Sequence, residues 1–567
     1  MQLLRPLFGL AALQHSAHAT QFSFSTPTVS TSSIQWTDLT APPDANATSQ
    51  LIFDAVNAVL QHWPHTRYRN GHTIIPGTVP VGTLLYHGRQ DRELPRTPEW
   101  TSVDPEHSFP FAGDSTTDAN TTAEGCWQHT LVTTRPLKVL YFDGSSAANI
   151  KEGGTLDMQD LLIWGKVDPA RWVDERERLD DLCAWGNDFG LDGFVRMEMD
   201  FEIMLCDFSQ GVELISTDYL AALWSRHITP PLQRHTALSL DTTSSADNLS
   251  GPNDRIVADI LRFETIHAGS WHNQYPGDTR FKLDLTGLVS FYDTTLAPSL
   301  IPARRGKERW DHRPAGISAT DLTAVKARVG EVLTRGPDSD GSGIDWQASF
   351  HVIVDRYADR LETLAYLLNT TTPDTVSERA RLIQTQLRIM LTPYILYTAR
   401  PTPGRSSTAS DSDTWALPVW KGCATKHTAH IHASPTLQSR MTVSERLLLT
   451  ALDKTNREIC RVVVKMWAAG VHAGLDPFIP LESDDGHATT LALQDSLRVV
   501  HDWRADADRL MSWLDWAVWV KCRPACGVEE MCYLPTWPFF WHEGRKDERW
   551  ERPQPRCIRR FEPYSQL

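Results

Sequence analysis

The 567-residue chain has no excess of positive charge, because 55 lysines and arginines stand against 70 aspartates and glutamates, giving a formal net charge of −15. A protein that coats nucleic acid needs a basic excess to neutralise phosphates, so we expect no nucleic-acid partner. No apolar run beyond the N-terminus is long enough to span a bilayer, so we expect no membrane partner. P-loop, G-x-G-x-x-G and G-x-S-x-G motifs are also lacking. These absences exclude several common nucleotide-binding and hydrolase classes.

The N-terminus is typical of a secretory signal peptide. Arg5 supplies the positive charge, Leu7–Leu13 the apolar segment, and Ala17-His18-Ala19 the small-residue cleavage pattern. We therefore expect residues 1–19 to be removed and the mature protein to be secreted or extracellular.

Cysteines and glycosylation sequons agree with that compartment. Asn-x-Ser/Thr occurs at Asn46, Asn120, Asn248 and Asn369, which predicts a glycoprotein. Nine cysteines include a late group, Cys522, Cys526, Cys532 and Cys557. This crowding favours disulfide bonds over zinc, because the spacing matches no zinc-ligand pattern. The odd count leaves at least one thiol unpaired within the chain, and the pairing is not readable from spacing.

Sequence patterns divide the chain into an α+β part and a mainly helical part. After the signal we expect an α+β domain with an N-terminal arm (20–245), a helical domain (246–400), a low-complexity linker (401–413) and a helical, disulfide-containing C-terminal region (414–567). Helical periodicity predicts helices over 174–190, 350–369, 377–399, from 442 toward 469, and over roughly 491–520. Thr442 and Glu445 form a capping-box pattern. Residues 131–143 predict two strands or one bent strand, because Arg135-Pro136 interrupts them.

The segment Phe194–Cys206 has the alternation of one long strand. One predicted face is apolar, and the other carries Arg196, Glu198, Asp200 and Glu202. Such a row of acids is kept either on a solvated face or in a site that uses it. Glu202 has a plainer alternative role, an ion pair with Arg196 or Arg89.

Residues of about 80–215 resemble the ADP-ribosyltransferase fold, a split β-sheet that binds NAD in a cleft. The resemblance rests on the order of LLYHG, WTSVDPEHSF, LVTTRPLKVLYFD, LDGF and MDFEIMLCD. It departs from the family where Arg89 replaces a hydroxyl residue and where the second segment lacks a tyrosine. The resemblance implies an NAD-dependent ADP-ribosyltransferase or NAD glycohydrolase acting on an unknown acceptor, with NAD as substrate and no metal.

The same resemblance implies roles for particular residues. Glu202 is the expected catalytic carboxylate, because an acid beneath the ribose stabilises the positive charge of the oxocarbenium-like transition state. Asp200 and His87 complete the expected catalytic set. The residues expected to hold NAD are Tyr86, Gly88, Arg89, Trp100 and Ser102.

Two other functions are compatible with the same residues. The fold is also compatible with a non-catalytic secreted interaction protein. The run FGLDGFVRMEMDFE is loosely similar to the acidic strand of chitinase-type glycosidases, which predicts a glycoside hydrolase with paired carboxylates on the 194–206 strand.

Overall fold

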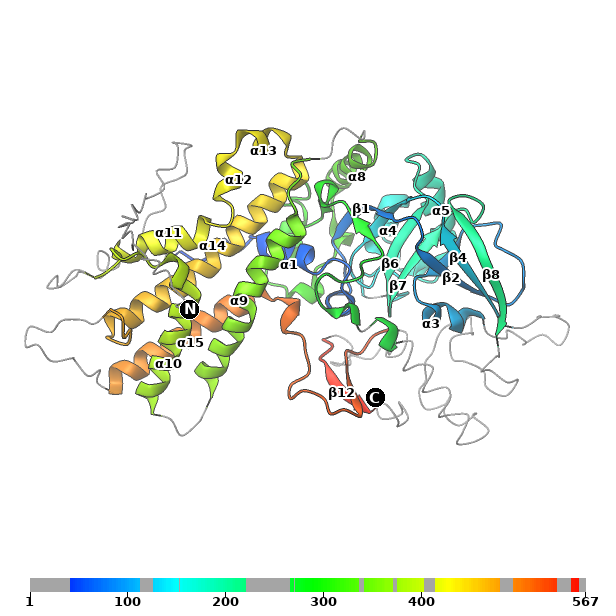
Figure 1. Cartoon of the computed structure of the whole chain (residues 1–567). Coiled ribbons are helices and arrows are strands. Elements are labelled where there is room, and N and C mark those ends of the chain that lie inside the picture. The colour runs from blue at the N-terminus through cyan, green and yellow to red at the C-terminus, as the bar shows by residue number, and fades with distance from the viewer. Residues whose placement is uncertain are drawn as a thin grey trace, which may run out of the picture.

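The protein's structure is a computed structural model that describes residues 41–112, 126–151, 153–220, 266–269, 271–335, 341–370, 375–401, 414–479, 493–537 and 552–559. The predicted signal, the linker beyond Pro401, and the sequons at Asn120 and Asn248 lie outside these residues. Figure 1 shows the strands gathered on one side and the long helices on the other. This arrangement confirms the predicted α+β class with a mainly helical part after the sheet.

One ten-stranded, mostly antiparallel sheet contains nearly all the strands of the described chain. Its order is β10-β1-β5-β6-β7-β3-β2-β4-β8, and β9 pairs with β1. The only parallel pair among these strands is β5–β6, joined through helices α4 (Asp157–Ile163) and α5 (Glu175–Asn187). The strands are β1 (Thr73–Val79), β2 (Leu84–Arg89), β3 (Glu99–Ser102), β4 (Cys126–Thr133), β5 (Leu137–Phe142), β6 (Gly193–Met197), β7 (Phe201–Leu205), β8 (Val212–Leu220), β9 (Lys282–Leu283) and β10 (Val289–Ser290).

The predicted single strand over 194–206 is wrong, because this segment is a hairpin of β6 and β7. Arg196 lies directly opposite Glu202, and Met197 opposite Phe201. The chain turns through Glu198, Met199 and Asp200, where the Glu198 amide donates to the Asp200 carbonyl at 3.2 Å. Opposite charges facing each other across an antiparallel pair stabilise this register.

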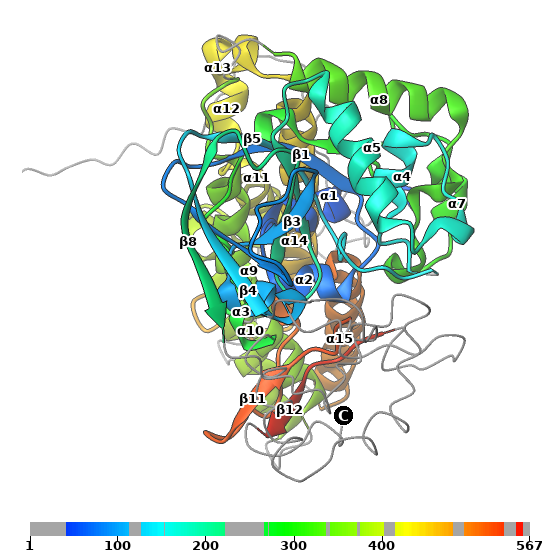
Figure 2. The ribbon, with the colours of Figure 1, turned by 90° about the vertical axis from the view of Figure 1, so that its right-hand side faces the viewer.

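The two faces of the sheet are covered by different helices. One face carries Phe142, Phe194 and Met204, which pack with residues of α4, α5 and α8 (Ala319–Leu333). The other face belongs to a larger core that continues into the helical part through α1 (Ser49–Asn57). In Figure 1, α1 lies between the sheet and the long helices, and Figure 2 shows the sheet side of the molecule facing the viewer. Phe53 of α1 contacts Phe350 with ring centroids 4.8 Å apart, so this helix joins both parts of the core.

The long helices follow the predicted pattern. They are α9 (Trp346–Asn369), α10 (Val376–Leu391), α14 (Val443–His472) and α15 (Leu493–Leu514), and the capping box of Thr442 and Glu445 is present. Helix α10 ends earlier than predicted, because Pro393 cannot continue it. Helix α15 ends before Asp515, whose φ of 43° is left-handed. The shorter helices are α2 (His62–Arg67), α3 (Pro105–Ser108), α7 (Leu300–Arg304), α11 (Leu417–Thr425), α12 (Ala429–Ala433) and α13 (Pro435–Arg440).

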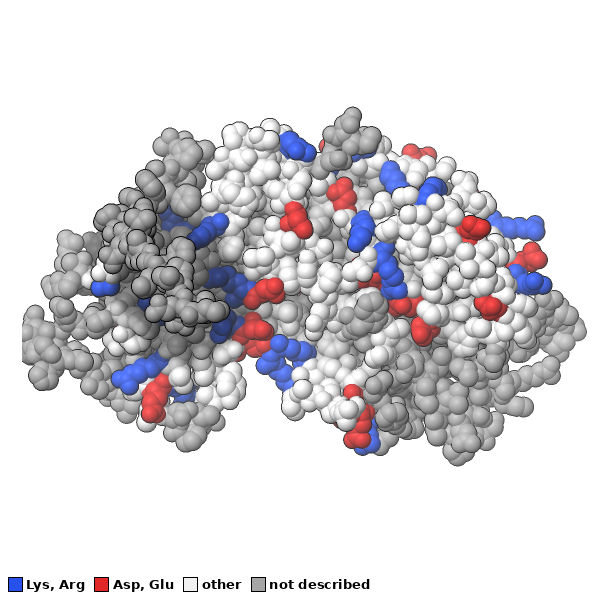
Figure 3. All heavy atoms as spheres, viewed as in Figure 1, with Lys and Arg blue, Asp and Glu red and all other residues white. Residues whose placement is uncertain are grey.

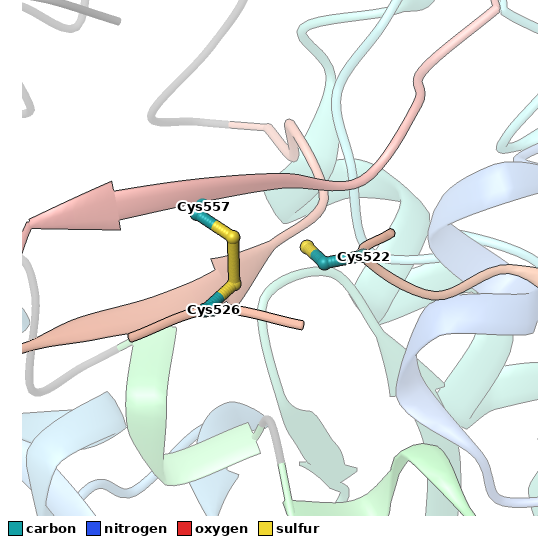
Figure 4. A group of neighbouring side chains, drawn as sticks. All are labelled: Cys522, Cys526 and Cys557. Atoms are coloured by element: carbon teal, nitrogen blue, oxygen red, sulfur yellow. A yellow bond between two sulfur atoms is a disulfide. The ribbon is translucent and has the colours of Figure 1, made fainter. Parts of the chain in front are cut away.

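Eight of the nine cysteines form disulfide bonds. The pairs are Cys183–Cys206, Cys423–Cys460, Cys522–Cys532 and Cys526–Cys557. Figure 4 shows Cys522 beside the Cys526–Cys557 bond, which joins the C-terminal segment carrying β11 (Glu530–Tyr533) and β12 (Arg556–Arg559). Cys126 is the one free and buried thiol, as the odd count predicts. The late cysteines are therefore disulfide-bonded rather than free thiolate ligands.

The surface view in Figure 3 shows basic and acidic side chains scattered among uncharged ones on the face it presents. Within the described ranges, no helix combines the length and apolar character needed to cross a bilayer.

Candidate functional site

Several sequence-predicted residues form one row across four neighbouring strands. Tyr86 of β2 pairs with Ser102 of β3, Ser102 with Glu202 of β7, and Glu202 with Arg196 of β6. Residues directly opposite one another in a sheet point to the same face. Trp100 stands two residues before Ser102 and shares that face, where the Arg176 guanidinium lies 4.8 Å from its ring centroid. The sheet therefore brings Tyr86, Ser102 and Glu202 together.

His87 lies on the opposite face from Glu202, because it follows Tyr86 directly in the strand. Its ring contacts Phe208 at 5.3 Å between centroids, and its Nδ1 lies 2.7 Å from the Trp100 carbonyl. Burial lowers the pKa of His87 to about 4, so the ring is neutral near pH 7. The structure thus does not bring His87 and Glu202 to one ligand.

Gly88 and Arg89 are engaged by the chain itself. A side chain at Gly88 would meet the Ser108 carbonyl at 2.2 Å, so α3 and the turn after it cover the backbone where NAD was expected to approach. Arg89 donates to both carboxylate oxygens of Asp91, at 2.7 and 3.1 Å.

Glu202 forms the ion pair that was its alternative role. Its Oε1 accepts from Arg196 Nη2 at 2.6 Å and from Nε at 3.0 Å. Arg196 also donates to both carboxylate oxygens of Glu175, at 3.0 and 3.1 Å. Burial raises the pKa of Glu202, and Arg196 opposes that shift without cancelling it.

A second acid and a histidine lie beside this ion pair. Glu198, in the hairpin turn, is buried, and its Oε1 lies 3.7 Å from His107 Nε2 of α3. Burial raises the pKa of Glu198 to about 8, which outweighs the attraction of Arg196. Burial also lowers the pKa of His107. Both side chains are therefore mainly uncharged near pH 7, and Glu198 carries a proton.

Asp200 at the tip of the hairpin lies beside Asp104, which follows β3, and the pKa values of these two aspartates are shifted in opposite directions. Asp200 is fully buried, and its pKa is raised well above the ordinary value by burial and then by the neighbouring Asp104 carboxylate. Burial works in the same direction on Asp104, but hydrogen bonds from Arg280 outweigh it and lower the pKa of Asp104. Arg280 donates to both Asp104 oxygens, at 2.9 and 2.7 Å. The more easily ionised acid of the pair is therefore Asp104, and Asp200 is the one that more readily keeps a proton.

Asp104, Asp200 and a nearby histidine are close enough together to bind a metal ion, but Arg280 already supplies the positive charge at this position. Oxygens of Asp104 and Asp200 and a ring nitrogen of His272 lie within 4.8 Å of one another. Arg280 contacts two of the three residues, since its Nη2 also lies 3.1 Å from His272 Nε2. A divalent metal would have to displace this guanidinium, so the residues fit a metal poorly.

We call Asp104, His107, Glu198, Asp200, Glu202 and Arg280 the hairpin cluster. The sequence pattern placed three of these, Glu198, Asp200 and Glu202, in one acidic run, and named Asp200 and Glu202 as catalytic candidates. Asp104 and His107 stand in the WTSVDPEHSF segment, where Asp104 precedes Pro105 and His107 follows it by two positions, shortly after a strand. That pattern could have identified Asp104 and His107 as candidate site residues. No such pattern marks Arg280, which is distant in sequence.

The comparisons with known proteins cover this part of the chain. Residues 34–131 and 129–228 match the family model of the YPL277C N-terminal domain. Over 549 residues the chain is 25% identical to "Uncharacterized protein YOR389W" of Saccharomyces cerevisiae, an alignment that spans 86% of this chain and 81% of the relative. It is 26% identical over 382 residues to "Uncharacterized protein YPL277C" of the same yeast, covering 57% of this chain and 76% of the relative. No solved structure matches the chain.

Proposed function

We propose that the hairpin cluster is an acid–base centre that hydrolyses glycosidic bonds. The observation that supports this most is the Asp104–Asp200 pair, whose carboxyl oxygens lie within 4.8 Å and whose pKa values are shifted in opposite directions. Glycoside hydrolysis needs one protonated and one ionised carboxyl group near the scissile bond. The two acids come from the hairpin turn and the end of β3, rather than from one strand.

The chemistry assigned to each residue follows from its charge. Asp200 gives its proton to the leaving oxygen as the C–O bond breaks, while the Asp104 carboxylate attacks the anomeric carbon. Asp200, now a carboxylate, then takes a proton from water, and the water oxygen replaces Asp104 on that carbon. A short carboxyl separation of about 5 Å is typical of this retaining route. Arg280 keeps Asp104 ionised at the start.

Access to the cluster is from the side of Asp104 and Arg280. Their side chains are 15% and 24% exposed, whereas Asp200 is fully buried. Half-buried Tyr86 lies on the same side of the sheet as Ser102 and offers an aromatic ring for a sugar to stack on.

Transfer or hydrolysis of ADP-ribose from NAD remains a prediction of the resemblance. It requires His87 and Glu202 to contact one ligand, and the row geometry separates them onto two faces. For that reason we place glycoside hydrolysis first.

We further propose that the protein folds in an oxidising compartment and is secreted. The four disulfide bonds support this, because disulfides rarely persist in reducing compartments.

The test is hydrolysis of a panel of nitrophenyl and dinitrophenyl glycosides by the purified protein. Asp200→Asn should slow nitrophenyl glycosides about 10²–10⁴-fold, the usual contribution of a general acid. It should slow dinitrophenyl glycosides much less, because that leaving group needs no proton. Asp104→Asn should slow both. The matched control is Asp476→Asn, a buried carboxylate in the helical part that accepts from Trp467 and Arg388.

Equal rates in the Asp200→Asn variant, or no turnover of any glycoside, would overturn the proposal. NAD turnover that is lost in Glu202→Gln would then favour the ADP-ribosyltransferase prediction. Absence of both activities would favour the non-catalytic interaction protein.

A further inference from the structure

A separate groove lies where the start of α1, the segment after α7 and the end of α15 meet. Its volume is about 460 Å³, within the size range of small-molecule sites of roughly 300–1,000 Å³. The residues that matter here line it together: Arg304, Arg305, Lys307, Trp310, His312 and Trp513. None of them belongs to the hairpin cluster.

Arg304 is a buried cation of this groove, and no described acid forms an ion pair with it. It is only 7% exposed, and it donates through Nη2 to the Phe291 carbonyl at 2.8 Å. Its Nε and Nη1 atoms are buried and have no hydrogen-bond partner among the described residues. The guanidinium also lies 4.5 Å from the Tyr292 ring centroid, which partly compensates its charge. A buried, incompletely bonded guanidinium is costly unless something else satisfies it.

The acids around the groove are already neutralised by other partners. Asp515 pairs with Arg67 at 3.3 Å, and Glu308 pairs with Arg552. Arg309, a cation of the same wall, is held by Asp54 at 2.6 Å. Exposed Lys307 forms no ion pair within the described ranges. Arg305 donates only to the neutral Asn46 side chain, at 3.2 Å. Arg304, Arg305 and Lys307 are therefore groove cations that have no acidic partner within the described ranges.

We infer that this groove binds a small organic anion, with its phosphate or carboxylate group held by Arg304 and Lys307. The planar guanidinium offers paired donors that match both kinds of oxyanion. Half-buried Trp310 and Trp513 provide apolar walls for a ring attached to the anionic group. This binding site is independent of the proposed hydrolysis, because it shares no residue with the hairpin cluster.

The test is a titration of the full-length protein followed by thermal unfolding and calorimetry. Inorganic phosphate, phenyl phosphate and benzoate are compared with sodium chloride at equal ionic strength. At least one of these anions should raise the unfolding temperature above the chloride control. Comparing phenyl phosphate with benzoate shows whether the groove prefers a phosphate or a carboxylate group. The ring-bearing ligand of the preferred class should bind about tenfold tighter than inorganic phosphate or acetate, since stacking on tryptophan adds affinity.

Two variants separate binding from folding. Arg304→Met removes the buried cation directly, and Lys307→Glu reverses an exposed charge that folding does not need. Lys307→Glu should weaken binding at least about tenfold. The control Lys454→Glu makes the same charge change at an exposed position of α14 and should leave binding unchanged. No stabilisation by any anion, or equal binding by wild type and Lys307→Glu, would overturn the inference. An equal loss in Lys454→Glu would also overturn it, because the effect would then be one of net charge.

Discussion

Glutamates that are shielded from solvent in the sheet part and in the helical part of the molecule have pKa values shifted in opposite directions. Glu445 in the helical part accepts from the Ser342 and Thr442 amides and from Trp346 Nε1, and these bonds outweigh burial and lower its pKa. Glu198 in the hairpin turn is surrounded more completely by protein than Glu445, and there burial prevails and raises its pKa to about 8. The balance between burial and the donors aimed at the carboxylate decides the direction of the pKa shift. Glu445 therefore anchors the start of α14 with a lowered pKa, whereas Glu198 in the hairpin cluster has a raised pKa.

The largest expected effect on stability comes from removing a central arginine. Arg196→Met leaves Glu202 buried without its ion-pair partner, while Glu175 keeps Arg178. We expect a loss of about 3–5 kcal/mol in the free energy of unfolding. Arg388→Met in the helical part should cost less, about 1–3 kcal/mol, because Asp476 keeps its other donors. Urea unfolding of both variants measures the difference. Equal losses would contradict the contrast between the two parts.

A smaller effect is expected in the pH dependence of stability. The pKa of Glu198 is raised on folding, so its contribution is present below its ordinary value of about 4.5 and is lost as pH rises toward about 8. Glu198→Gln should therefore flatten the fall in unfolding free energy by about 1 kcal/mol per pH unit within that window.

The matched control for this prediction is Glu445→Gln. The pKa of Glu445 is lowered on folding, so its contribution is present above its ordinary value and is lost only as pH falls below it. This variant should leave the slope between about pH 5 and pH 8 unchanged. A flattened slope in both variants, or in neither, would show that Glu198 is not the titrating group.

The smallest effect concerns glycosylation, which follows from the proposed secretion. Asn369 is exposed at the end of α9, whereas Asn46 is half-buried and accepts from Arg305 at 3.2 Å. We expect glycan occupancy to be higher at Asn369 than at Asn46 when peptides of the secreted protein are analysed by mass spectrometry. Full occupancy at Asn46 would argue against free access to the groove beside it.

The helical part was the more predictable of the two. Its apolar periodicity and the Thr442–Glu445 capping box are local patterns, and local patterns determine where helices begin. The predicted helix continued to Ala399 because its apolar pattern continues past Pro393, whereas α10 ends at Leu391.

The hairpin was missed because its turn contains no glycine, proline or asparagine. Apolar residues alternate on through Met199, so the period of a strand continues across the bend. A signal was nevertheless available, since Arg196 and Glu202 are placed symmetrically about Met199, as cross-strand partners in a hairpin must be.

The rest of the two sites depends on contacts between distant segments. Arg280 reaches Asp104 across 176 positions of sequence, and no local pattern predicts that contact. The groove had a local signal, because Arg304, Arg305 and Lys307 form a basic run in a chain with a net charge of −15. The unpaired state of Arg304 is visible only in the fold.

The protonation state of Asp200 tests the central claim most directly. Infrared difference spectra near pH 7 compare the wild type with Asp200→Asn, using Asp476→Asn as the control. We expect Asp200→Asn to remove a protonated carboxyl band, because burial and the neighbouring Asp104 carboxylate raise the pKa of Asp200 well above its ordinary value. Loss of an ionised carboxylate band instead would contradict an acid–base centre at the hairpin tip.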